Sequence, residues 1–360
     1  MPRSTTTIDV LRHVQVFYQP GRYGGWPANH GIWAWGDEIL AGFQVGAYKD
    51  QRGHTIDWDQ PIRKVFARSR DGGETWALED TLPEALDNLV DAGNPAGRPN
   101  PHLGAAACPG GIDFAHPDFA MTFSHASFHT GPSRFWISHD RGRAWGGPYR
   151  LPDMGARGIA ARTDYLVNGA NDCTLFLTAA KSNGREGRPL CARTRDGGKT
   201  WQLQSWIGPE PQEGFAIMPA SLRLSAGHLL AAVRVQADSS HSSIAAWRSH
   251  DDGMTWQPAT APVPSLPTSN PPALLRLRDG RLCLTYGVRA MPYRICARLS
   301  ADEGISWGDE LVLRDDGANG DIGYTRSVCR ADGSIVTVYY FNDAASSPDR
   351  YIGATIWRAL

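Results

Sequence analysis

The chain of 360 residues lacks the features that mark membrane, nucleic-acid-binding and secreted proteins. Its 36 lysines and arginines are balanced by 37 aspartates and glutamates, so we expect no basic surface for nucleic acid. No apolar stretch approaches the ~20 residues of a membrane-spanning helix. Residues 1–7 lead into mixed polar sequence, without the apolar run of a secretion signal. We therefore expect a soluble, cytoplasmic protein that binds neither nucleic acid nor membranes.

Cysteine patterns typical of metal sites are also missing. The six cysteines are scattered without metal-ligand spacing. No glycine-rich phosphate loop follows a predicted strand. We therefore expect no nucleotide, haem or metal cofactor, and we expect buried, reduced thiols at Cys108, Cys173, Cys191, Cys283, Cys296 and Cys329.

Five copies of the pattern Ser/Thr-x-Asp-x-Gly-x-x-Trp recur along the chain. They occupy residues 69–76, 138–145, 194–201, 249–256 and 300–307. Their starts lie about 50 to 70 residues apart, the repeat length of a propeller blade. In such a box the Asp and Ser/Thr side chains bond nearby backbone N–H groups, Gly supplies a left-handed conformation, and Trp packs beside the turn. Because a catalytic carboxylate would not be needed five times, we interpret these aspartates as structural.

Helical periodicity is weak, and residues 82–90 form the best helical candidate. Short apolar runs bounded by Gly, Pro and Asp predict strands instead. Six of them recur as the second strand of a repeated unit, at residues 38–43, 119–123, 174–177, 228–233, 281–286 and 334–339. We therefore predict an all-β fold, a six-bladed β-propeller that forms a single domain over residues 1–360. Residues 10–18 are expected to pair beside the last blade and close the ring.

The five boxes, together with strands such as residues 272–282, make the chain resemble the sialidase (neuraminidase) superfamily over nearly its whole length. The resemblance implies that the boxes lie at outer turns and that an active site lies at the opposite mouth of the ring. It also implies three arginines for a substrate carboxylate, an Asp as general acid, and a Tyr nucleophile activated by a Glu. Arginine forks match a carboxylate, and a neutral Tyr can approach an anionic sugar that would repel a carboxylate nucleophile.

Several residues match this pattern individually. Tyr324, in Gly323-Tyr324-Thr325-Arg326, resembles the nucleophile, although an aromatic residue that only packs is the alternative. Arg234 follows the strand at 228–233 where the family places a carboxylate-binding arginine. Arg289 is the best match to a second one, with Arg294 as its competitor.

The general acid is expected in the loop at residues 53–61. Asp57 and Asp59 bracket the right spacing, and we favour Asp57. His54 is a neighbour that could tune or share the proton transfer.

Two departures from the family pattern stand out. No Phe-Arg-Ile-Pro-like segment opens the first blade, so Arg22, Asn29 or His30 would have to face the place of the first arginine. Met218 stands where the activating Glu is expected, and it cannot act as a base. Glu213 could substitute if its loop folds inward.

Further polar residues open the inner strands and are expected to point toward the axis, where they would hold a ligand or an ordered water network. They are His102, Arg162, Asp164, Tyr165, Asn270 and Asp321, with Arg326 beside Tyr324.

Three functions remain open on this basis. The first is a glycoside hydrolase that acts on an acidic, sialic-acid-like sugar, with Asp57 as acid and Tyr324 as nucleophile. The second is a polysaccharide lyase in which arginine neutralises a uronate carboxylate while Tyr324 and a histidine such as His30 or His102 move the proton. The third is a glycan-binding propeller without catalysis. In each case the expected partner is an acidic carbohydrate.

Overall fold

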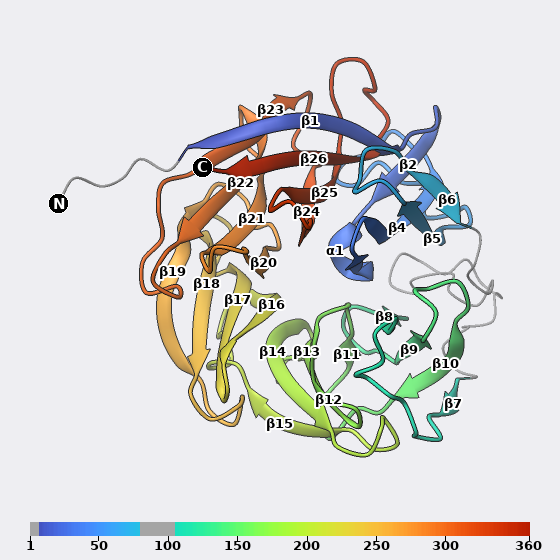
Figure 1. Ribbon diagram of the computed structural model, residues 1–360, viewed down its shortest axis with the longest axis vertical. Coiled ribbons are helices and arrows are strands. Elements are labelled where there is room, and N and C mark those ends of the chain that lie inside the picture. Colours follow the sequence, from blue (N-terminus) through green and yellow to red (C-terminus); the bar gives the residue numbers. More distant parts are fainter. Residues whose placement is uncertain (1–6, 80–104) are drawn as a thin grey trace.

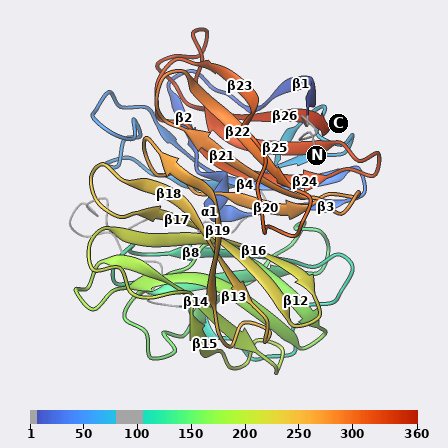
Figure 2. The ribbon, with the colours of Figure 1, turned by 90° about the vertical axis from the view of Figure 1, so that its left-hand side faces the viewer.

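The computed structural model describes residues 7–79 and 105–360, which form a ring of six β-sheets (Figure 1). Each sheet consists mainly of consecutive antiparallel strands, as short alternating apolar segments joined by tight turns favour. The side view shows the sheets stacked around the ring as twisted layers (Figure 2). The prediction of an all-β, six-bladed propeller is confirmed.

The first three blades follow each other along the chain. Blade 1 contains β2 (Arg22–Gly25), β3 (Ile32–Trp35), β4 (Glu38–Ala47), β5 (Arg63–Ser69) and β6 (Ala77–Glu79), with the helix α1 (Pro27–His30) between β2 and β3. Blade 2 contains β7 (Ala106–Ala107), β8 (Ala120–His125), β9 (Ser133–Ser138) and β10 (Gly146–Leu151). Blade 3 contains β11 (Ile159–Ala160), β12 (Tyr165–Gly169), β13 (Asp172–Ala180), β14 (Glu186–Thr194) and β15 (Gln202–Trp206).

The remaining blades are more regular. Blade 4 contains β16 (Phe215–Ser225), β17 (His228–Gln236), β18 (Ser242–Ser249) and β19 (Gln257–Leu266). Blade 5 contains β20 (Ala273–Arg276), β21 (Leu282–Val288), β22 (Tyr293–Ser300) and β23 (Leu311–Gly317). Blade 6 contains β24 (Gly323–Cys329), β25 (Ile335–Phe341), β26 (Tyr351–Ala359) and β1 (Ile8–Phe17).

The N-terminal strand closes the ring. β1 pairs antiparallel with β26, from Ile8 opposite Ala359 to Phe17 opposite Ile352, so the two ends of the chain share blade 6. Figure 1 shows these two strands running side by side. This shared blade keeps the ring closed. The expectation that residues 10–18 pair beside the last blade is confirmed.

Each box forms the turn between the last two strands of its blade in blades 1 to 5, and its hydrogen bonds are those expected from the sequence. In the first box, Ser69 Oγ donates to Asp71 Oδ1 at 2.7 Å and accepts from the Gly73 N–H at 2.7 Å. Asp71 Oδ1 also accepts from the Thr75 N–H at 2.9 Å. The aspartates therefore hold turns, as the sequence predicts.

The box glycine also joins neighbouring blades. Gly73 has φ +96°, and a Cβ there would lie 3.1 Å from Val336 in the preceding blade of the ring. The other four box glycines likewise pack against the preceding blade: Gly142 on Leu40, Gly198 on Ile112, Gly253 on Cys191, and Gly304 on Leu230. Each box thus stabilises a hairpin and a blade-to-blade contact together.

The core lies between the blades and is built mainly from aliphatic and aromatic side chains of the second and third strands. All six cysteines are free thiols, five of them buried and Cys329 partly buried, as predicted. No helix among the described residues is long and apolar enough to cross a membrane. The helix predicted at residues 82–90 lies outside the described residues.

We expect Asp302→Ala to destabilise the protein by about 1–2 kcal/mol, because the box then loses hydrogen bonds from the hydroxyls of Ser300 and Ser306 and from the Ser306 N–H. Urea unfolding measures the change, with Asp309→Ala, an exposed aspartate beyond the same box, as the matched control. Equal unfolding midpoints for the two variants would show that the box adds no stability.

Candidate functional site

The strand order separates the boxes from the candidate site. Neighbouring strands of an antiparallel blade run in opposite directions. The first strand therefore begins on the side of the ring opposite the box turn, and the second strand finishes on that same side. We call this side the mouth. Tyr324 lies near the start of β24, Arg234 near the end of β17, and Arg289 directly after β21. All three residues therefore lie at the mouth, away from the boxes.

Tyr324 has an unusual backbone that a buried amide holds in place. Its φ is +52°, and the pairing of β24 with β25 shifts register between Gly323 and Arg326. Asn270 Oδ1 accepts the Tyr324 N–H at 3.1 Å, and Asn270 Nδ2 donates to the Ile322 carbonyl at 3.1 Å. Asn270 was predicted to bind substrate, but it is fully buried and instead positions the backbone of Tyr324.

Two arginines flank the Tyr324 side chain, as the resemblance implied. Arg234 Nη1 donates to the Tyr324 hydroxyl at 3.0 Å, and Arg234 Nε donates to Ser269 Oγ at 3.1 Å. The Arg289 guanidinium carbon lies 5.5 Å from the centre of the Tyr324 ring, and Arg289 Nε donates to the Ile322 carbonyl at 2.9 Å. Among the described residues, Arg234 Nη2 and Arg289 Nη1 have no hydrogen-bond partner. These two nitrogens can receive a carboxylate.

The electrostatics of this group favour the ionised phenol. Burial opposes ionisation of Tyr324, which is 9% exposed, but the positive charges of Arg234, Arg289 and Arg162 outweigh it. The pKa of Tyr324 is therefore lowered from its ordinary value near 10. The pKa of Tyr340, whose ring lies 5.8 Å from that of Tyr324, is raised by burial. Of these two tyrosines, only Tyr324 has an environment suited to a nucleophile.

Met218 occupies the place expected for a Glu base. It has φ +53°, and its N–H donates to Thr178 Oγ1 at 3.0 Å. Its sulfur lies 3.9 Å from Arg234 Nη1. Trp26, in blade 1, has a similar φ of +58° just before its own Pro-Ala segment. No carboxylate therefore stands beside the Tyr324–Arg234 pair in the described part of the chain.

A second polar group centres on Asp321, which was predicted as a polar inner-strand residue. Asp321 Oδ1 accepts from His54 Nδ1 at 2.7 Å and from the Tyr340 hydroxyl at 2.7 Å. Asp321 Oδ2 accepts from the Tyr23 hydroxyl at 3.2 Å and lies 3.4 Å from Arg350 Nε. Burial works against the charge on Asp321, but its hydrogen bond and ion pair with His54 lower the pKa to about 2. The carboxylate is therefore ionised.

Hydrogen bonds and ring contacts join the two groups. Arg289 Nη2 donates to the Tyr340 hydroxyl at 2.5 Å, so Arg289, Tyr340, Asp321 and His54 form one chain of hydrogen bonds. Tyr324 and His54 both pack against Tyr340, with ring centres at 5.8 and 6.5 Å. Tyr324 and His54 thus belong to one cluster.

An aromatic wall borders His54. The Trp26 ring packs edge-on against His54 at 5.0 Å and stacks on Trp58 at 5.6 Å. The sequence analysis missed Trp26, Trp58, Tyr23 and Tyr340. A signal for Trp26 exists, since Trp26-Pro27-Ala28 repeats the Met218-Pro219-Ala220 pattern at the same point of its blade.

Arg162 and Arg326, both predicted to bind substrate, are committed to protein acceptors. Arg162 forms an ion pair with Glu186 at 2.5 Å, with both side chains below a tenth exposed. Arg326 Nη2 donates to the carbonyls of Ala28, at 2.7 Å, and Thr163, while Nη1 donates to Asp164 at 3.3 Å. Burial raises the pKa of Asp164 to about 6, although Arg326 and Ser221 favour its charged form. Arg162 is thus held within blade 3, whereas Arg326 joins blade 6 to blades 1 and 3.

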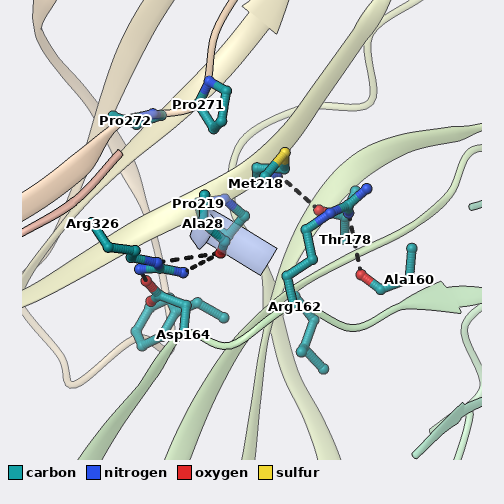
Figure 3. A pocket seen from close by; sticks show the side chains of 12 residues that line it. Ala28, Ala160, Arg162, Asp164, Thr178, Met218, Pro219, Pro271, Pro272 and Arg326 are labelled. Atoms are coloured by element: carbon teal, nitrogen blue, oxygen red, sulfur yellow. Dashed lines mark hydrogen bonds and ion pairs between the residues drawn. The ribbon is translucent and has the colours of Figure 1, made fainter. Parts of the chain in front are cut away.

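Figure 3 shows the small cavity that these residues line, with Met218 and Pro271 on the opposite side. Its volume is about 10 Å³, room for a single water-sized molecule. A sugar ring cannot enter this space. Met218 lines this cavity and also contacts Arg234.

His30 lies in the interior of the ring at the end of α1. It is 3% exposed, and both ring nitrogens lack a partner among the described residues. Burial lowers the pKa of His30 well below its ordinary value, and the charge of Lys64 adds to this effect. A buried, neutral imidazole does not support the catalytic role predicted for His30.

Several other predicted residues lie apart from the Tyr324 cluster. Asp57 Oδ1 pairs with Lys49 at 3.2 Å, and Glu213 is exposed; within the described ranges neither contacts Tyr324 or Arg234. Arg294 bonds Glu310 at 2.9 Å, which favours Arg289 over Arg294 at the site. His102 lies outside the described residues. No group of three His, Cys, Asp or Glu side chains in the described chain is arranged to hold a metal ion.

We expect Asn270→Ala to reduce stability by about 1–3 kcal/mol, because the Tyr324 N–H and the Ile322 carbonyl lose their buried partner. Thermal unfolding measures the loss, and Asn183→Ala in an exposed turn is the control. The Tyr324 phenol should also return toward the ordinary pKa of tyrosine, because the ring no longer faces Arg234. An unchanged midpoint and titration would contradict the positioning role of Asn270.

Comparison with known proteins agrees with this architecture. The BNR repeat-like domain family matches residues 121–337, and no curated protein matches the chain. Among solved structures, a protein of unknown function from Dyadobacter fermentans is similar with a TM-score of 0.69 at 18% identity, over 98% of this chain and 99% of that one.

Two solved glycosidases share the fold at lower identity. A Trypanosoma rangeli sialidase in complex with 2,3-difluorosialic acid, described as a covalent intermediate, has a TM-score of 0.63 at 12% identity, over 98% of this chain and 59% of that one. A Penicillium chrysogenum alpha-L-arabinanase complexed with arabinobiose has a TM-score of 0.59 at 12% identity, over 97% and 98%. The repeated boxes, the six-bladed ring and the family match over residues 121–337 together show that this chain belongs to the BNR repeat-like domain family.

Proposed function

We propose that this protein is a glycoside hydrolase that acts on a sugar bearing a carboxylate. One observation carries the proposal: the Tyr324 hydroxyl accepts a hydrogen bond from Arg234 while Arg289 lies against its ring. The similarity of the fold to a sialidase and to an arabinanase supports a carbohydrate-active role, because both are glycosidases.

Arg234 and Arg289 are suited to hold the carboxylate. Each is anchored through Nε, to Ser269 Oγ and to the Ile322 carbonyl, and each keeps a terminal nitrogen without a partner among the described residues. Anchoring reduces the rotamer freedom that binding would otherwise cost. Charge-assisted bonds from two such nitrogens favour an anionic sugar over a neutral one. The substrate class is therefore an acidic sugar, such as a sialic-acid-like or uronic acid.

Tyr324 is suited to attack the anomeric carbon. Although burial opposes its ionisation, the positive charges of Arg234, Arg289 and Arg162 lower the pKa of Tyr324 and so favour the nucleophilic phenolate. In the proposed reaction the phenolate oxygen forms a bond to the anomeric carbon as the glycosidic bond breaks. Water then hydrolyses the tyrosyl glycoside and regenerates the phenolate. Met218 contributes no proton chemistry in this scheme.

A uronate lyase is the second candidate, and the contact of His54 with ionised Asp321 favours it. In that reaction the arginines would stabilise the negative charge that develops on the carboxylate as a base removes the neighbouring C–H proton. Elimination would leave an unsaturated sugar, whose near-ultraviolet absorbance separates this outcome from hydrolysis.

We expect the protein to turn over at least one member of a panel of sialosides, related nonulosonic acids and uronides, and Tyr324→Phe to lower kcat by more than about 100-fold. Reducing-sugar release and near-ultraviolet absorbance measure the two products. Tyr339→Phe removes a buried phenol hydroxyl that bonds Thr355 outside the site, and it serves as the fold control. Undiminished turnover by Tyr324→Phe would remove Tyr324 from the mechanism, and glycan binding without turnover across the panel would favour a binding protein.

We expect Tyr324 to ionise at lower pH than the other tyrosines, because Arg234 and Arg289 favour its phenolate despite burial. The tyrosinate absorbance should therefore show an early step as pH rises, which Tyr324→Phe removes. Arg234→Met, which removes a positive charge next to the hydroxyl, should move this step to higher pH. An early step that persists in Tyr324→Phe would assign it to another tyrosine.

A further inference from the structure

We propose that His54 donates the proton to the leaving group, and that Asp321 is its positioning residue. The inference rests on the proposed glycosidase function and assigns a role that the sequence interpretation gave to Asp57. Three observations carry it: the contact of His54 with Asp321, the exposure of the imidazole, and the link to Tyr324 through Tyr340.

The orientation of His54 is set by its Nδ1 atom. Nδ1 lies 2.7 Å from Asp321 Oδ1 and 3.3 Å from the Tyr23 hydroxyl. Because Asp321 is ionised, it accepts a hydrogen bond, and Nδ1 must donate it. Nε2 is then the nitrogen that gains and loses the proton, and it has no partner among the described residues. The side chain of His54 is 32% exposed, whereas that of Asp321 is 10% exposed. The His54–Asp321 dyad is therefore held by its buried carboxylate, and the Nε2 edge of His54 is open to a ligand.

The surroundings of the dyad are fixed by buried groups. Tyr23 and Tyr340 both donate to the Asp321 carboxylate, and Arg350 lies 3.4 Å from it. Arg289 is the nearest cation on the Tyr324 side, bonded to the Tyr340 hydroxyl at 2.5 Å. The edge-on contact with Trp26 at 5.0 Å restrains the imidazole plane. These contacts leave His54 one ring orientation.

The position of His54 suits a leaving group. Tyr324 and His54 lie against the same Tyr340 ring, so a sugar whose carboxylate is held by Arg234 and Arg289 has His54 on its other flank. Trp58, stacked on Trp26 beside His54, offers an aromatic surface to the departing sugar. In glycosidases the acid and the nucleophile face the scissile bond from two such flanks.

Asp57 is less suited to the same role. It lies in the same loop, but its carboxylate pairs with Lys49 at 3.2 Å. The same oxygen also accepts the Asp59 N–H at 3.1 Å, so the contacts of Asp57 lie with Lys49 and its own loop. In the described part of the chain, no contact joins Asp57 to Asp321, Tyr340 or Tyr324.

The proton balance closes within these residues. As the phenolate of Tyr324 bonds to the anomeric carbon, the glycosidic C–O bond breaks and its electron pair stays on the leaving oxygen. The proton on His54 Nε2 passes to that oxygen, which leaves as an alcohol. In the second step the neutral imidazole takes a proton from the attacking water, the C–O bond to Tyr324 breaks, and the phenolate is restored.

Leaving-group dependence tests the role of His54. A poor alcohol leaving group needs a proton, whereas an activated nitrophenolate departs without one. We expect His54→Gln to lower kcat/KM by about 100-fold or more for a natural glycoside of the acidic sugar and by less than about 5-fold for its dinitrophenyl glycoside. Asp57→Asn, from the same loop, is the matched variant and should affect both substrates equally.

Several outcomes overturn the inference. If His54→Gln slows both substrates equally, or if Asp57→Asn alone shows the selective loss, His54 is not the acid. Absence of turnover by the wild type on every acidic glycoside would instead remove the proposed function, and the proton-transfer role with it. The two failures are therefore distinguishable.

The positioning role of Asp321 has a readout that does not require turnover. In protein labelled with ¹⁵N-histidine, His54 should carry its proton on Nδ1 when neutral, and Asp321→Asn should shift it toward the Nε2–H form. Asp321→Asn should also reproduce the selective loss of His54→Gln on the natural glycoside. An unchanged tautomer in a folded Asp321→Asn variant would contradict the positioning role.

Discussion

Closure of the ring by β1 is the constraint on which the rest of the structure depends. Pairing of β1 with β26 puts both ends of the chain in blade 6, so the series of blades closes into a ring around one axis. Antiparallel order then brings strand starts and strand ends of different blades to the mouth, while the boxes lie at the other end. The box glycines, each packed on the preceding blade, hold this spacing at the outer turns. Residues as distant in sequence as His54 and Asp321 meet for this reason.

The candidate site uses backbone geometry that a regular blade does not have. Trp26, Met218 and Tyr324 all have φ between +52° and +58°, a region that non-glycine residues adopt at a cost of about 1–3 kcal/mol. A kinked strand re-aims the side chain at its kink. At Tyr324 the cost is offset by Asn270, whose amide bonds both sides of the kink. The hydrogen bonds of Asn270 therefore compensate the backbone strain at Tyr324, where the side chain departs from the alternating pattern of a regular strand.

Periodic features of the sequence predicted the fold, whereas the site was predicted only in part. The five boxes and six second strands repeat, so each copy supports the interpretation of the others as parts of a blade. The prediction that residues 10–18 close the ring also followed from this count of blades. Tyr324, Arg234 and Arg289 were found because each stands at a recognisable point of its blade. Tyr23 and Tyr340 carry no such signal, since an aromatic side chain in a strand is usually core. That the loop at residues 53–61 carries the general acid stays a prediction, and the directions of His54 and Asp57 depend on Asp321 and Lys49, which only tertiary contacts reveal.

The presence of Met218 where a Glu base is expected changes which residues carry out the proposed proton transfers. A carboxylate beside Arg234 would compete with the substrate for that guanidinium, and its negative charge would oppose ionisation of Tyr324. The Met218 sulfur, 3.9 Å from Arg234 Nη1, does neither. A bound substrate carboxylate still neutralises part of the positive charge that favours ionisation of Tyr324. Substrate binding at the arginines and ionisation of the Tyr324 phenol therefore oppose each other. With no base beside the phenol, the remaining proton-transfer group must stand elsewhere, and the His54–Asp321 pair on the far side of Tyr340 is placed to supply it.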